Sequence, residues 1–171
     1  MLYPDVLPFF SFLRDLKLSD SMPRVIVGII TNSDDRVPSI LRDMGLRVNT
    51  RRYHPTVGFY DRLEDSNADI DFVTMSYDVG NSKPDPEIFK AAYRLSGVQG
   101  EVVHCIHVGD NLEEDVKGAE RAGWQGVLLQ RKAPSGESSV DLPPALHIRS
   151  LEELQGILQQ ARLTMEGAKV P

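Results

Sequence analysis

Short apolar segments alternate with amphipathic segments of helical spacing along most of this 171-residue sequence. Apolar runs between turn signals are typical of buried strands, and apolar residues three and four apart are typical of helices that face a core. Strands that alternate with helices form βαβ units, so the pattern predicts an α/β fold, a Rossmann-like parallel sheet with flanking helices. The predicted strands are 25–30, 72–76, 102–108 and 126–129, and the predicted helices are 4–17, 34–44, 86–95, 113–122 and 151–163.

Two stretches lack such a pattern. Residues 47–71 are polar, and residues 131–144 contain several prolines. We expect both to be irregular loops. The chain length and the lack of enough strands on either side of these loops predict a single domain over residues 1–171.

Composition excludes several classes of protein. Nineteen Lys and Arg against 25 Asp and Glu give a net charge of -6, which argues against a basic nucleic-acid-binding face. The single cysteine, Cys105, excludes a disulfide framework. No apolar run approaches the roughly 20 residues that span a bilayer, and no signal segment stands at the start. We therefore expect a cytoplasmic protein that binds neither nucleic acid nor membranes.

Polar residues follow the first two predicted strands, at the edge where open parallel sheets bind ligands. Thr31 and Asn32 offer a hydroxyl, an amide and backbone N–H groups that suit an anion, although such residues are also ordinary helix caps. Lys83 stands beside Pro84 ahead of a helix, so its ammonium is either held in place or simply solvated.

Two carboxylates follow the third predicted strand. Asp110 comes after Gly109, which permits a close backbone approach, and Asp115 lies in the next helix. Acids are favoured at helix N-termini, but paired carboxylates also suit Mg²⁺. Taken together, a hydroxyl, a lysine and two carboxylates at one sheet edge predict a phosphate and magnesium site.

The same strand contains His104 and His107. We expect both histidines on one face of the strand. Packing with a satisfied ring N–H is the favoured interpretation, ahead of metal binding.

Three segments resemble motifs II, III and IV of the haloacid dehalogenase superfamily, and the resemblance extends over residues 3–129. They are Ile29-Ile30-Thr31-Asn32-Ser33, Lys83-Pro84-Asp85-Pro86, and His107-Val108-Gly109-Asp110 with Asp115. The resemblance implies the phosphatase branch, with Mg²⁺-dependent hydrolysis of a phosphate monoester through an aspartyl-phosphate. It further implies that a small phosphorylated molecule is the substrate.

The resemblance also implies roles for individual residues. Thr31, Asn32 and Lys83 would bind the phosphate, and Thr31 and Lys83 would take part in catalysis. Asp110 and Asp115 would hold the Mg²⁺.

The family's motif I, a central strand that ends in Asp-x-Asp and carries the nucleophile, has no counterpart here. Asp34-Asp35 are adjacent, and Asp69-Ile70-Asp71 precedes a predicted strand instead of following one. We therefore expect a core truncated at its N-terminus, inactive alone and weak in Mg²⁺ binding. Segments 25–30 and 102–108 would then have bare edges, which predicts marginal stability or self-association.

Two other classes of protein share some of these features. A non-catalytic module that binds phosphate or Mg²⁺, or acts as a scaffold through the incomplete sheet edge, is the main alternative. A receiver-type signalling domain fits less well, because its acidic pair would come near the first strand and its lysine after the last.

Overall fold

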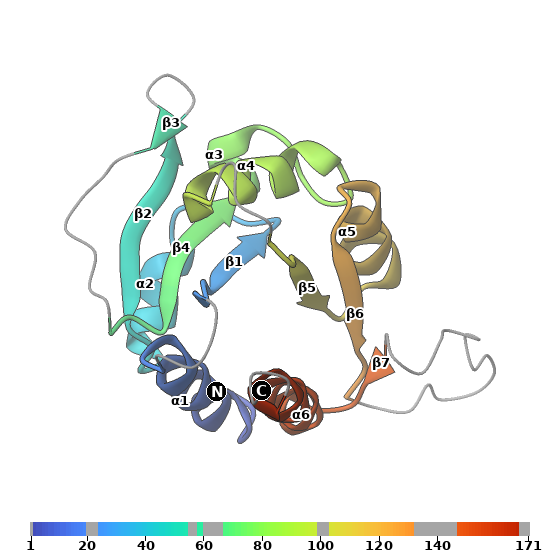
Figure 1. The fold of residues 1–171 in the computed structure, drawn as a ribbon. Coiled ribbons are helices and arrows are strands. Elements are labelled where there is room, and N and C mark those ends of the chain that lie inside the picture. Colours follow the sequence, from blue (N-terminus) through green and yellow to red (C-terminus); the bar gives the residue numbers. More distant parts are fainter. Residues whose placement is uncertain are drawn as a thin grey trace.

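The computed structural model describes residues 2–19, 24–54, 58–59, 67–98, 103–131 and 147–167. These residues form an α/β fold of parallel strands and flanking helices, as the sequence predicts (Figure 1). The strands are β1 (Gly28–Thr31), β2 (Val48–His54), β3 (Gly58–Phe59), β4 (Ile70–Met75), β5 (Ile106–Gly109), β6 (Gln125–Leu129) and β7 (His147–Ile148). The helices are α1 (Val6–Lys17), α2 (Val37–Asp43), α3 (Ser76–Val79), α4 (Pro86–Ser96), the π-helical segment η1 (Leu112–Lys117), α5 (Gly118–Arg121) and α6 (Leu151–Gly167).

The strands form two separate sheets. The first has the order β1-β4-β2-β3, in which β4 pairs in parallel with β1 and β2, and β3 pairs antiparallel with β2. The second is parallel and has the order β5-β6-β7. Strands β1 and β5 are therefore edge strands, and among the described strands none pairs with their outer edges (Figure 1).

A groove of about 160 Å³ lies between these two edges, with Ile30 and Phe72 on one side and Ile106 and His107 on the other. Ile26 and His104, which precede the two strands, line the same groove. Among the described strands the expected bare edges are thus present, and β1 and β5 do not pair with each other.

Helices cover both faces of the sheets and join them into one core. On one face, α4 packs its Phe89 and Leu95 against β1, β4 and the segment that follows β5. On the other face, α1 and α6 pack against β6 and β7 through Phe9, Leu13 and Leu154. Apolar side chains of the β1 and β5 halves share these clusters, so the helices hold the two sheets together.

For the described residues of 47–71, the prediction of an irregular loop was wrong. Its first part forms β2, which pairs in parallel with β4, and β3 follows as a short antiparallel strand. The charged residues of β2 obscured the strand because their partners are distant in sequence. Arg52 pairs with Asp78 at 2.5 Å, and Arg51 donates to the Leu95 carbonyl oxygen at 2.7 Å.

Several predicted bounds also change. Strand β1 begins at Gly28 and β5 at Ile106, each later than predicted, and the predicted helix over 113–122 divides into η1 and α5. Helix α3 and strand β7 were not predicted. Most of the predicted 131–144 loop lies outside the described residues. No described helix is both long enough and apolar enough to cross a membrane.

Candidate functional site

Lys83 lies in the turn that precedes α4. The turn is fixed by Asp85, whose carboxylate accepts hydrogen bonds from the Glu87 N–H at 2.9 Å and from the Asn81 amide at 2.8 Å. The Lys83 ammonium donates to the Ile30 carbonyl oxygen at 3.1 Å and to Asp115 Oδ1 at 2.6 Å. Lys83 therefore joins the end of β1 to the helical segment that follows β5.

Asp115 is 4% exposed, and its carboxylate accepts three hydrogen bonds. Its Oδ1 atom contacts Lys83 Nζ and His107 Nε2, the latter at 3.0 Å, and its Oδ2 atom accepts from the Asn111 N–H at 2.9 Å. Burial by itself raises the pKa of this carboxyl group, but the hydrogen bonds from His107, Lys83 and Asn111 outweigh it. The pKa of Asp115 therefore lies well below its usual range, and the group is ionised at neutral pH.

Gly109 makes room for this carboxylate. A Cβ atom on Gly109 would lie 2.1 Å from Asp115 Cγ and 2.2 Å from Oδ2, closer than any side chain tolerates. The close approach predicted for this glycine is thus made by a side chain of the same protein, and it brings the carboxylate against the end of β5.

Asn32 follows β1 and is exposed. Its Oδ1 atom accepts from the Lys83 N–H at 2.7 Å, and its Nδ2 atom donates to the Lys83 carbonyl oxygen at 3.0 Å and to Glu114 at 3.2 Å. The amide group therefore holds the backbone on both sides of Lys83. The Asn32 side chain thereby positions Lys83.

The other two predicted site residues lie at the same edge. Thr31 is the last residue of β1, and Asp110 directly follows β5 with an exposed side chain. Among the described residues, no hydrogen bond joins the side chain of Thr31 or Asp110 to the network around Lys83. Thus Asn32, Lys83 and Asp115 are in direct contact, whereas Thr31 and Asp110 share only the edge.

Residues that were not predicted for the site complete the network. Glu114 and Asn111 come from the segment after β5. His107 comes from β5, and its ring is packed against Phe89 and hydrogen-bonded, as expected from the sequence. The sequence prediction placed both histidines on one strand, but only His107 lies in β5, and His104 precedes it. His104 is exposed, whereas His107 is 9% exposed.

The Asp-x-Asp segment at Asp69-Ile70-Asp71 lies at the start of β4, away from this edge. Asp69 pairs with Arg14, and Asp71 pairs with Lys17 at 2.7 Å and accepts from the Val27 N–H at 2.7 Å. These carboxylates fasten α1 to the amino-terminal edge of the sheet. They are therefore structural, and neither belongs to the Lys83 network.

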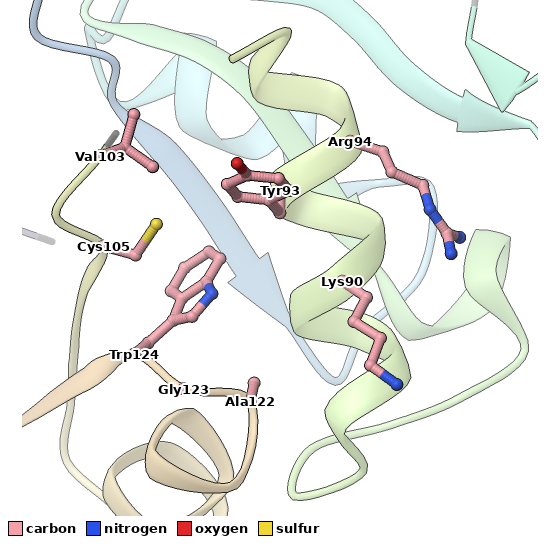
Figure 2. A pocket seen from close by; sticks show the side chains of 8 residues that line it. All are labelled: Lys90, Tyr93, Arg94, Val103, Cys105, Ala122, Gly123 and Trp124. Carbon is pink, nitrogen blue, oxygen red and sulfur yellow. The ribbon is translucent and has the colours of Figure 1, made fainter. Parts of the chain in front are cut away.

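A second hollow of about 580 Å³ lies near the amino-terminal ends of β5 and β6. Figure 2 shows that Tyr93 and Trp124 point toward one another across it, whereas Lys90 and Arg94 extend from the other side of α4. Lys90 also pairs with Glu87 at 2.7 Å. The cations therefore do not converge on the aromatic rings, and the candidate site remains the edge at Lys83.

The fold and these contacts define an α/β protein with a buried lysine–carboxylate pair at the carboxyl edge of its strands. The family model of haloacid dehalogenase-like hydrolases matches residues 1–123. The chain belongs to this family. The family match does not favour a non-catalytic module or a receiver-type domain.

Known relatives agree with this assignment. The haloacid dehalogenase-like hydrolase domain-containing protein 3 of Danio rerio is 32% identical over 132 residues, covering 77% of this chain and 45% of the relative. The glyceraldehyde 3-phosphate phosphatase of Methanopyrus kandleri is 34% identical over 101 residues, covering 57% of this chain and 42% of the relative. The chain thus spans less than half the length of these relatives.

Solved structures show the same fold. A HAD phosphatase from Thermococcus onnurineus superposes with a TM-score of 0.63 at 28% identity, covering 92% of this chain and 58% of that one. The putative HAD-hydrolase YfnB of Bacillus subtilis, solved bound to magnesium, has a TM-score of 0.63 at 21% identity, covering 92% of this chain and 56% of that one. The second comparison supports the fold alone.

Proposed function

We propose that this chain carries the phosphate-binding part of a Mg²⁺-dependent phosphohydrolase that acts on a small phosphorylated molecule. The observation that carries the proposal is the Lys83 ammonium, which is held by Asp115 and by the Ile30 carbonyl oxygen at the carboxyl edge of the strands. A lysine has three donors, so one N–H remains for a phosphate oxygen. The names of two relatives, a glyceraldehyde 3-phosphate phosphatase and a HAD phosphatase, point to the same chemistry.

Around the lysine, the neighbouring groups suit a phosphate. The Thr31 hydroxyl at the end of β1 would donate to a phosphoryl oxygen, and Asn32 would fix the Lys83 backbone through its side-chain amide. A buried ammonium that is already oriented stabilises charge on a phosphoryl group without reorganising during the reaction. Thr31 and Lys83 are therefore the residues that we assign to catalysis, and Asn32 joins them in binding.

The donor set fits Mg²⁺ with few protein ligands. The exposed Asp110 carboxylate is available as a direct ligand, and Asp115 Oδ2 has one hydrogen bond and a remaining lone pair. Within the described residues no cluster of three or more metal-ligating side chains occurs. Mg²⁺ commonly takes one or two carboxylates and completes its shell with water and phosphate oxygens. Asp110 and Asp115 would hold the ion, which would neutralise charge on the phosphate.

The nucleophile is proposed to lie outside this sequence. The family's nucleophilic aspartate stands in an Asp-x-Asp motif after a strand, and Asp69 and Asp71 are instead paired with Arg14 and Lys17 at the opposite edge. Without that carboxylate no aspartyl-phosphate forms, so the 171-residue chain binds phosphate and does not turn over.

A turnover assay tests this assignment. The purified chain is incubated with p-nitrophenyl phosphate and Mg²⁺, alongside Lys83→Gln as a control for contaminating phosphatases. We expect no hydrolysis above the control, because loss of a nucleophile typically costs factors of thousands or more. Mg²⁺-dependent turnover that disappears in Lys83→Gln would show that the nucleophile lies within these residues.

A further inference from the structure

His107 is a buried histidine that the proposed chemistry does not use. It lies in β5, two residues before Gly109, and its side chain is 10% exposed. On one side its ring packs edge-on against Phe89 of α4, with the ring centroids 5.2 Å apart. On the other side Nε2 lies 3.0 Å from Asp115 Oδ1.

The charge of Asp115 decides which way this hydrogen bond runs. The carboxylate is ionised and can only accept, so Nε2 carries the hydrogen and donates it. His107 and Lys83 therefore donate to the same oxygen atom. With the Asn111 N–H on the other oxygen, three donors from three segments fix both the position and the rotation of the carboxylate.

The space around the carboxylate leaves little tolerance for movement. Asp115 packs directly over Gly109, where a Cβ atom would lie 2.1 Å from Cγ. Oδ1 now lies 2.6 Å from Lys83 Nζ, and it would move away from Nζ if the carboxylate rotated. A residue that fixes the rotation of Asp115 thus also fixes the position of the lysine ammonium.

Packing alone does not require a histidine at this position. A phenylalanine ring would make the same edge-on contact with Phe89, but it would leave Asp115 Oδ1 with Lys83 as its only donor. The hydrogen bond from Nε2 is the specific contribution of His107.

We propose that His107 is a positioning residue, which holds the Asp115 carboxylate in the rotation that receives Lys83 and thereby sets the affinity of this edge for phosphate. The positioning of Lys83 stands on the contacts above. The effect on phosphate affinity rests also on the proposed function.

The first test measures the hydrogen exchange of the Lys83 ammonium directly. The Lys83 ammonium is observed by ¹H–¹⁵N NMR, assigned by its absence in Lys83→Arg, and its hydrogen exchange is measured in His107→Phe and His107→Gln. The Phe variant keeps the ring and loses the donor, so exchange should accelerate at least fivefold. The Gln amide nitrogen can take the place of Nε2, so its exchange should stay near that of the unmodified chain.

Two further variants make the test decisive. His104→Phe changes an exposed histidine near the same strand and should leave the Lys83 signal unchanged. His107→Asn carries its amide nitrogen too close to the backbone to reach Asp115, so it should resemble the Phe variant and not the Gln variant. If His107→Phe unfolds, the Gln and Asn pair gives the answer. Equal exchange of the Lys83 ammonium in all folded His107 variants would overturn the positioning role.

The second readout is the binding of inorganic phosphate in the presence of Mg²⁺, measured by calorimetry. Loss of one hydrogen bond to a charged group should weaken binding roughly tenfold in His107→Phe, with recovery in His107→Gln. Unchanged phosphate affinity in His107→Phe would overturn the effect on affinity. If the unmodified chain binds no phosphate while Lys83 exchange still follows the predicted order, the proposed function fails and the positioning role holds.

Discussion

Lys83 Nζ lies 2.6 Å from Asp115 Oδ1, and the two side chains are only 12% and 5% exposed. Removing the lysine leaves an ionised carboxylate buried without its cation. We therefore expect Lys83→Met to lower the free energy of unfolding by about 3 kcal/mol, measured by urea denaturation. In the matched control Lys90→Met, an exposed pair with Glu87 is broken, and the change should stay within about 0.5 kcal/mol. Equal effects of the two substitutions would contradict the buried pair.

Gly109 and Gly156 provide a second comparison. At Gly109 an added methyl group would meet the Asp115 carboxylate, which three hydrogen bonds hold in place, so Gly109→Ala should destabilise the protein by about 2 kcal/mol. At Gly156 in α6 nothing lies within 4 Å of an added Cβ. Alanine is the better helix former, so Gly156→Ala should stabilise by about 0.5–1 kcal/mol. Urea denaturation of both variants checks the sign of each change, and a neutral Gly109→Ala would refute the close approach.

Asp5 joins three segments of the chain and gives a pH-dependent stability. Its Oδ2 atom accepts from Arg131 Nη1 at 2.8 Å and from the Leu151 N–H at 2.8 Å. Burial by itself raises the pKa of Asp5, but these two donors outweigh it, so the folded pKa is lowered. The stabilisation is therefore complete above the unfolded pKa of about 4 and is lost as the pH falls through the folded pKa.

The comparison of the unmodified chain with Asp5→Asn measures this effect. At every pH from 5 to 8, the free energy of unfolding of Asp5→Asn should be about 2 kcal/mol lower than that of the unmodified chain. The difference between the two proteins should shrink below pH 4. Asp34→Asn, which removes an exposed local pair with Arg36, is the control and should show little difference at any pH. A difference in free energy of unfolding that stays constant down to pH 2 would contradict the lowered pKa of Asp5.

The outer edges of β1 and β5, which no described strand covers, predict that the chain associates with itself. Bare strand edges favour pairing with another molecule, and Ile106 at the β5 edge is 42% exposed. Light scattering after size exclusion should show a mass that rises with concentration. Ile106→Lys should reduce this association, whereas Ile157→Lys, on the 53%-exposed isoleucine of α6, should not. A monodisperse monomer at all concentrations would rule out association through these edges.

The sequence predicted those parts of the fold whose signals are local. The apolar segment that became β4 and the capped helix α4 were recognised because periodicity and Pro86 stand in the residues themselves. Strand β2 was missed because Arg51 and Arg52 find their partners at Leu95 and Asp78, contacts that only the tertiary structure supplies.

The candidate site shows the same division. Lys83 and Asp115 could be placed at one edge because both follow predicted strands. That Asn32 holds the Lys83 backbone and that His107 donates to Asp115 depended on side-chain directions that motif spacing does not specify.

The most direct test of the phosphate site at Lys83 is a calorimetric titration of the chain with inorganic phosphate in the presence of Mg²⁺. We predict saturable binding of one phosphate, at least tenfold weaker binding in Lys83→Gln, and unchanged binding in Lys90→Gln. Absence of saturable binding by the unmodified chain, or equal binding by the chain and Lys83→Gln, would contradict the phosphate site at Lys83.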